Sequence, residues 1–122
     1  MEQNILDSIK ILLGIQCDYD AFDNEIIYNI NNAFMDLYQL GFGKQPFVIK
    51  NKREIWSDAI ENNKFFEGIK MYIFQKTKLG FDPPGSSFVL ESINNQLRET
   101  EWRLNMQKEE FEKGEYKDAS ES

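Results

Sequence analysis

Hydrophobic residues recur at helical spacing in four stretches of the chain. The first, residues 4–13, places isoleucines and leucines three and four positions apart, and Gly14 follows as a natural helix stop. The second, residues 21–40, has the clearest period. Its apolar stripe consists of Ile26, Ile27, Ile30, Ala33, Phe34, Leu37 and Tyr38. Polar residues occupy the opposite face, so the pattern predicts an amphipathic helix with one buried side.

The third and fourth stretches, residues 64–81 and 86–111, are separated by Asp82-Pro83-Pro84-Gly85. Two adjacent prolines cannot continue a helix, because each lacks an amide hydrogen, and Ser86 or Ser87 can cap the helix that follows. The third stretch is apolar over more than half its circumference, which predicts a helix that is either central or in contact with partners on both sides. The fourth carries a narrower stripe of Leu90, Ile93, Leu97, Leu104 and Phe111. We therefore expect either a helical hairpin or a sharp corner at the prolines.

Residues 42–53 depart from the helical pattern. Glycines and a proline open the segment, Phe47-Val48-Ile49-Lys50 has β propensity, and Asn51-Lys52 favours a turn. A single strand must pair within a small hairpin or with a neighbouring molecule. Residues 55–60 then predict one or two helical turns. The sequence predicts a mainly α fold, a small bundle of about four helices with a short β-strand or hairpin excursion between the second and third long elements.

Length and composition indicate one globular domain. We place a helical domain at residues 1–112 and an acidic, flexible C-terminal tail at residues 113–122 of the 122-residue chain. Cys17 is the only cysteine, which excludes an internal disulfide. The first residues lack the basic region of a signal peptide, and no apolar run reaches membrane-spanning length. We expect a soluble protein made in a cytoplasm.

The net charge of −7 is distributed unevenly along the chain. Residues 1–43 carry −6, residues 44–80 carry +4 and residues 81–122 carry −5. A protein that binds DNA tightly needs Lys and Arg side chains that contact the phosphates. Only the middle block has an excess of these basic residues. Alternating blocks suit copies of the chain that pack against one another, although an ordinary mixed surface explains the charges equally well.

The residues that most enzymes use are missing. The chain has no histidine, the commonest general base and metal ligand, and Cys17 therefore lacks an activating partner. Gly41-Phe42-Gly43 does not open a helix after a buried strand, so it is not a phosphate-binding motif. Asp18, Asp20 and Asp23 lack the glycine and distal glutamate of a calcium loop, and helix capping accounts for Asp20 and Asp23. We expect no enzymatic activity, no cofactor and no metal.

Three segments resemble the head–tail connector (adaptor) proteins of long-tailed phages and prophages. They are Tyr19-Asp20-Ala21-Phe22-Asp23, Phe81-Asp82-Pro83-Pro84-Gly85-Ser86-Ser87-Phe88-Val89-Leu90-Glu91 and Glu101-Trp102-Arg103-Leu104-Asn105. The resemblance covers residues 5–107, and the Asp-Pro-Pro and Glu-Trp-Arg-Leu segments are its most distinctive parts. It implies a structural virion protein of the head–tail interface, present in the host cytoplasm during assembly.

Proteins of this kind form a ring, usually of twelve subunits, between the portal protein and the stopper or tail-completion protein. The ring extends a channel through which DNA passes without specific binding, and no membrane is involved. On this interpretation the 42–53 segment is a docking loop on the stopper or channel side, outside the core. Its contact residues are then Phe42, Lys44, Phe47, Lys50 and Lys52.

Several apolar residues lie outside the main helical stripes, notably Trp102 and Met106, which are four residues apart. Such residues either complete the core or contact a partner, and only the resemblance favours partner contact. We predict contacts with the portal or a neighbouring subunit through Trp102, Met106, Phe111, Met71 and Phe74. The alternative is a small helical regulatory module of phage or bacterial origin that binds a protein through the Trp102 helix. A weak nucleic-acid binder using Lys44, Lys50, Lys52 and Arg53 comes third.

Overall fold

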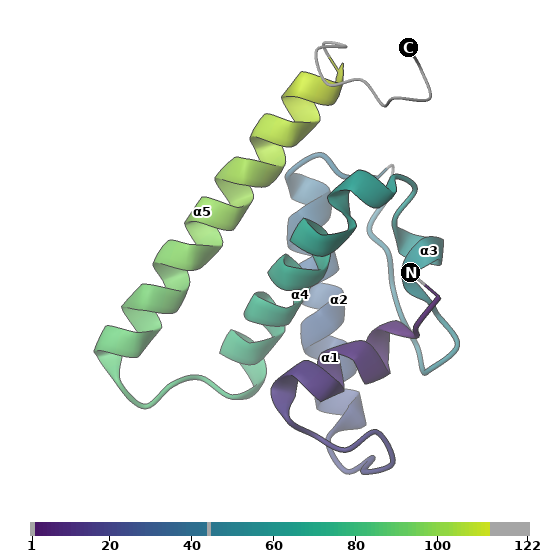
Figure 1. The fold of residues 1–122 in the computed structure, drawn as a ribbon. Coiled ribbons are helices and arrows are strands. Elements are labelled where there is room, and N and C mark those ends of the chain that lie inside the picture. The colour runs from purple at the N-terminus through teal and green to yellow at the C-terminus, as the bar shows by residue number, and fades with distance from the viewer. Residues whose placement is uncertain (1, 44, 113–122) are drawn as a thin grey trace.

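The computed structural model describes residues 2–43 and 45–112, and of residues 111 and 112 the backbone alone. The helices in chain order are α1 (Ile5–Leu13), α2 (Asp23–Gln39), α3 (Trp56–Ala59), the 3₁₀ helix η1 (Asn63–Phe65), α4 (Phe66–Phe81) and α5 (Ser87–Glu112). Figure 1 shows α4 at the centre of the molecule, in contact with α1, α2 and α5. The predicted mainly helical fold is confirmed, and of the two arrangements expected for the third stretch the structure has the central one. The predicted tail lies outside the described residues.

The helix ends follow from local chemistry. α1 ends at Leu13 and is capped by Gly14, whose φ of 82° lies in the left-handed region that glycine tolerates. α4 ends at Phe81, just before the two prolines, and α5 begins at Ser87. The Ser86 hydroxyl accepts from the amide of Val89 at 3.5 Å, as expected of a cap. The predicted corner therefore joins α4 and α5 into a hairpin (Figure 1).

The core combines the α2 stripe with residues from every other helix. Five of the seven predicted stripe residues are buried, while Ile27 is half-buried and Tyr38 is exposed. Trp56 at the start of α3 is also fully buried, although the sequence predicted only a helical turn there. Its indole N–H donates to the Ser8 hydroxyl at 3.0 Å, and its ring contacts Phe34. A buried Trp needs such a partner for its N–H, and Ser8 of α1 supplies it.

The predicted β-strand or hairpin is wrong, because residues 2–43 and 45–112 contain no strand. The segment around Ile49 is extended, but it runs along α2 instead of pairing with another strand. The Asn31 side chain accepts from the Ile49 amide at 2.8 Å and donates to the Ile49 carbonyl at 3.0 Å. One side-chain amide thereby satisfies both backbone groups that a β ladder would have used.

The same segment belongs to the core, which corrects the expectation that it lies outside. Ile49 is buried, and Phe42 and Phe47 pack against the core cluster. The Phe42 ring meets Phe65 edge-on, with the ring centroids 5.5 Å apart. The aromatic residues of this segment therefore contribute to stability, because each removes a large apolar surface from water.

A buried charge holds the loop between α1 and α2. Lys10 is fully buried, and its Nζ donates to the Cys17 carbonyl at 3.1 Å and the Tyr19 carbonyl at 2.6 Å. The same atom forms an ion pair with Asp23 at 2.7 Å. All three N–H donors of the ammonium are thus satisfied. The expected capping by Asp20 and Asp23 is wrong, since Phe22 occupies the N-cap of α2 without a side-chain cap.

Candidate partner-binding surfaces

A single stripe of side chains attaches α5 to the rest of the molecule. The helix makes its main contacts with α4. Between residues 87 and 110, Leu97 and Leu104 are the buried side chains of α5, and Ile93 is half-buried against the core. The approach is close at Gly68 of α4, where an added Cβ would lie 3.0 Å from Leu104 Cδ2. α5 therefore buries one face and leaves the remainder of its surface outward.

Polar contacts on α4 reinforce this attachment. The Tyr72 hydroxyl donates to the Glu101 carboxylate of α5 at 3.4 Å. Lys76 pairs with Asp36 of α2 at 2.8 Å and lies over the Tyr72 ring. Burial, together with the negative charges of Glu101 and Asp36, raises the pKa of Tyr72 far above its ordinary value. The hydroxyl therefore stays protonated, and remains a donor, to higher pH than that of an ordinary tyrosine. These contacts link α2, α4 and α5 in one polar chain.

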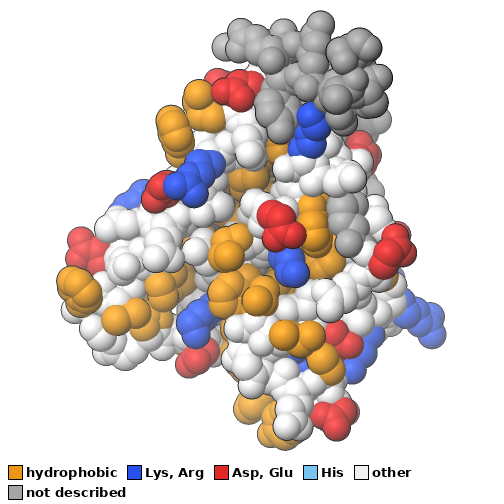
Figure 2. Space-filling model, viewed as in Figure 1, with side chains coloured by type: hydrophobic (Ala, Val, Ile, Leu, Met, Phe, Trp, Pro, Cys, Tyr) orange, Lys and Arg blue, Asp and Glu red, His pale blue; other side chains and the backbone are white. Residues whose placement is uncertain are grey.

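The outward face of α5 carries large apolar side chains. Phe88 is 80% exposed, Trp102 63% and Met106 38%. On a helical wheel these three residues share one side, opposite Leu97 and Leu104. Figure 2 shows hydrophobic side chains at the surface near both ends of this helix. We call Phe88, Trp102 and Met106 the α5 face. Sequence reasoning identified Trp102 and Met106 by their spacing but did not single out Phe88.

The other predicted partner-binding residues differ in their surroundings. Met71 is exposed on α4, whereas Phe74 is half-buried and packs against the core. The side chain of Phe111 lies outside the described part of the chain. The five predicted residues therefore do not form one uniformly exposed surface, because Phe74 packs partly against the core.

The basic residues predicted for the docking loop also have different roles. Lys50 is exposed, and Lys44 lies outside the described residues. The Lys52 Nζ donates to the Cys17 carbonyl at 2.7 Å and pairs with Asp7 at 3.4 Å. Lys52 therefore ties its turn to α1 and to the loop after it. Phe47, the remaining loop residue, meets the Phe34 ring with the centroids 5.4 Å apart and is part of the hydrophobic packing.

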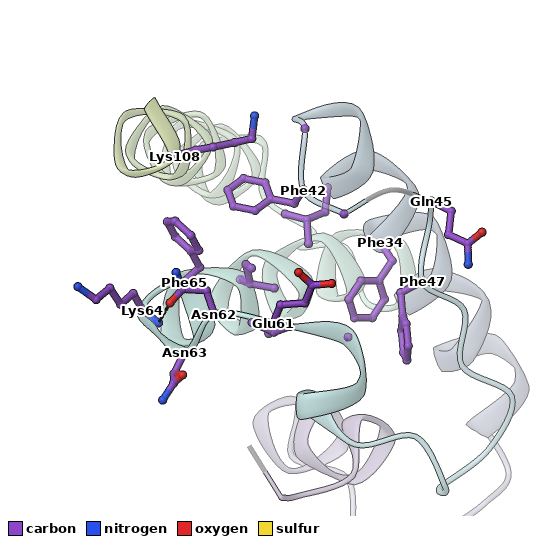
Figure 3. Close-up of a pocket in the computed structure, with 16 residues that line it drawn as sticks. Phe34, Phe42, Gln45, Phe47, Glu61, Asn62, Asn63, Lys64, Phe65 and Lys108 are labelled. Atoms are coloured by element: carbon purple, nitrogen blue, oxygen red, sulfur yellow. Dashed lines mark hydrogen bonds between the residues drawn. The ribbon is translucent and has the colours of Figure 1, made fainter. Parts of the chain in front are cut away.

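A cavity of about 540 Å³ opens near the C-terminal end of α2, and sequence reasoning missed it. Figure 3 shows its aromatic wall and the polar side chains around it, with Lys108 reaching in from α5. The aromatic wall is formed by Phe34, Phe42, Phe47 and Phe65. The residues that line the cavity come from segments that are distant in sequence, so no local sequence pattern could have predicted it.

The described residues contain no cluster of acidic, histidine or cysteine side chains of the kind that forms a metal site. Among residues 2–43 and 45–112, no group of three or more His, Cys, Asp or Glu side chains could hold a metal ion. Asp23, one of the three acids considered as metal ligands, pairs with the Lys10 ammonium. Across the same ranges, the helices are too short or too polar to cross a membrane.

These features define a small helical protein whose most distinctive surface feature is a set of large, exposed apolar side chains on the outward side of a long helix. A family model described as "Phage connector protein" matches residues 5–111, and the chain belongs to this family. The resemblance seen in the sequence is thereby confirmed, and the family suggests a structural connector role in a phage particle. No curated protein and no solved structure matched the chain.

Proposed function

We propose that this protein forms an oligomeric ring between the portal and the stopper or tail, where it extends the DNA channel at the head–tail joint. The observation that carries the proposal is the α5 face, defined above as Phe88, Trp102 and Met106. The family match supports a structural role in the virion, with assembly in the host cytoplasm. We propose no catalytic activity, because the family is a structural one.

The exposed aromatic residues favour a protein that works in an assembly. Burying a large apolar side chain is worth about 1.5–3 kcal/mol, and Phe88 and Trp102 leave most of that unrealised in the monomer. Trp is also among the residues that most often dominate the affinity of a protein interface. The most direct way to bury both residues is contact with another subunit or with the portal.

The distribution of basic residues supports a channel through which DNA slides without being held. Five of the basic residues are already in ion pairs with acids, which leaves them less available to phosphates. They are Lys10, Lys52, Lys76, Lys78 and Arg103. With a net charge of −7, the chain offers little of the cationic surface that tight, salt-sensitive DNA binding requires.

Size-exclusion chromatography with light scattering, with and without the portal protein, tests the proposal. We expect a ring-sized species or a stable complex with the portal. A protein that stays monomeric under both conditions would contradict the proposal. Sub-micromolar binding of duplex DNA that weakens steeply with salt would instead favour the nucleic-acid alternative.

A further inference from the structure

The outward side of α2 is almost free of charge. Its exposed residues are Asn24, Glu25, Tyr28, Asn32, Met35, Tyr38 and Gln39, and only Glu25 among them is charged. α2 contains no Lys or Arg, and its other two acids are paired, Asp23 with Lys10 and Asp36 with Lys76. Charged residues make up 29% of the whole chain, so this side differs from the remaining surface.

Two large side chains lie in the middle of this weakly charged surface, which we call the α2 face. Tyr28 is 67% exposed and Met35 is 45% exposed, and they lie seven residues apart on one side of the helix. The centre of a protein interface is typically depleted in charge and enriched in Tyr and Met. The α2 face therefore has the composition of an interface, although its amides suggest a solvated surface when the sequence is considered alone.

The α2 and α5 faces cannot cover each other within one molecule. α4 packs against both helices and lies between them, as Figure 1 shows. The buried stripe of each helix faces inward, so the two exposed faces point away from the core on different sides of the domain. A partner that covers the α5 face must come from another molecule, and the same holds for the α2 face.

The exposed areas of the two faces are similar in size. Aromatic side chains present about 150–250 Å² each when fully exposed. Phe88, Trp102 and Met106 offer on the order of 400 Å² together, and Tyr28, Met35 and Tyr38, the last of them 37% exposed, offer about 300 Å². Flanking polar residues on both helices add to the area that each face can bury. A standard interface buries ~800 Å² on each partner.

We propose that the α2 face of one copy of this chain receives the α5 face of a second copy. This pairing rests on the proposed function, because it names the two surfaces through which neighbouring subunits would contact each other. Since the two surfaces differ, the contact is head to tail, and repeated copies close into a ring or continue as a filament. A contact between two identical faces would instead stop at a symmetric dimer.

Two arginine substitutions, one on each face, test the pairing. Tyr28→Arg blocks the α2 face, and Trp102→Arg blocks the α5 face. Both side chains are exposed, so the melting temperatures should match that of the unaltered protein. Each variant alone should lose ring formation, with association at least about 30-fold weaker, on the scale of an interface hot spot. Ile11→Arg, at an exposed apolar position on α1, is the matched control and should assemble normally.

The decisive measurement is an equimolar mixture of the two variants, analysed by light scattering with and without portal protein. Tyr28→Arg keeps an intact α5 face and Trp102→Arg keeps an intact α2 face, so together they should form a heterodimer that cannot grow. Rings that persist in both variants would overturn the pairing while leaving the proposed ring in place. Variants that fail to combine would also overturn it. Failure of the unaltered protein to assemble, alone or with portal, would remove the proposed function and the pairing together.

Discussion

Replacing Asn31 with alanine should detach the extended segment from α2 and destabilise the whole domain. The substitution removes the partner of both backbone groups of Ile49, at 2.8 and 3.0 Å, and Ile49 is buried. An orphaned buried donor or acceptor costs about 1–3 kcal/mol, so losing both partners should cost ~2–6 kcal/mol. A domain of this size has a stability of about 5–15 kcal/mol, and the loss is therefore a large fraction of it.

Urea unfolding followed by circular dichroism measures the change in the free energy of unfolding. The matched control is Asn32→Ala on the exposed side of the same helix, which should change stability by no more than about 0.5 kcal/mol. Hydrogen exchange at the Ile49 amide should accelerate in Asn31→Ala and not in the control, because its acceptor is gone. If both variants have the same midpoint and the same exchange rate at Ile49, the bidentate contact does not hold the segment.

The remaining predictions concern single contacts in the domain. Lys10→Met leaves the Asp23 carboxylate and the Tyr19 carbonyl without the Lys10 donor, while the Cys17 carbonyl keeps its bond from Lys52, and should lower the free energy of unfolding by about 3 kcal/mol; a loss under about 1 kcal/mol in urea unfolding would contradict this. Gly80→Ala brings a methyl group against the Asn29 carboxamide, which must move aside and give up its bond to the Glu25 carbonyl, so the gain of about 0.5–1 kcal/mol from helix propensity should appear in full only in an Asn29→Ala background; an equal change in melting temperature in both backgrounds would refute the close approach. The raised pKa of Tyr72 means that the unfolded chain loses this proton first, so stability should be full below about pH 10 and fall above it; Tyr72→Phe should flatten that decline in alkaline melts.

The helices and the corner could be predicted because their signals are local. The α2 stripe repeats with the helical period, and the adjacent prolines break a helix wherever they occur. The exposure of Trp102 followed from the same reasoning, since a wheel centred on Leu97 and Leu104 places it outside. These features depend on the spacing of residues along one element, which the sequence contains directly.

Contacts between distant segments could not be predicted in this way. Phe47 to Lys50 have β propensity, but propensity does not determine which groups bond to the backbone of the segment. Here the Asn31 side chain of α2 bonds to the backbone of Ile49 in place of a second strand. Asp23 was assigned to capping because nothing in the sequence places Lys10 beside it. The α2 face was missed because asparagines at helical spacing suggest a solvated surface, and only the ion pairs of Asp23 with Lys10 and of Asp36 with Lys76 show how little unpaired charge remains.

The most direct test of the account is the mass of the assembly formed by Trp102→Ala in the presence of portal protein. The account predicts that the monomer melts at the same temperature as the unaltered protein, since Trp102 is exposed. Ring formation or portal attachment should weaken by ~2 kcal/mol or more, while Ile11→Ala should leave both unchanged. A large drop in melting temperature, with normal attachment by the folded fraction, would show that Trp102 stabilises the domain and is not part of an interface.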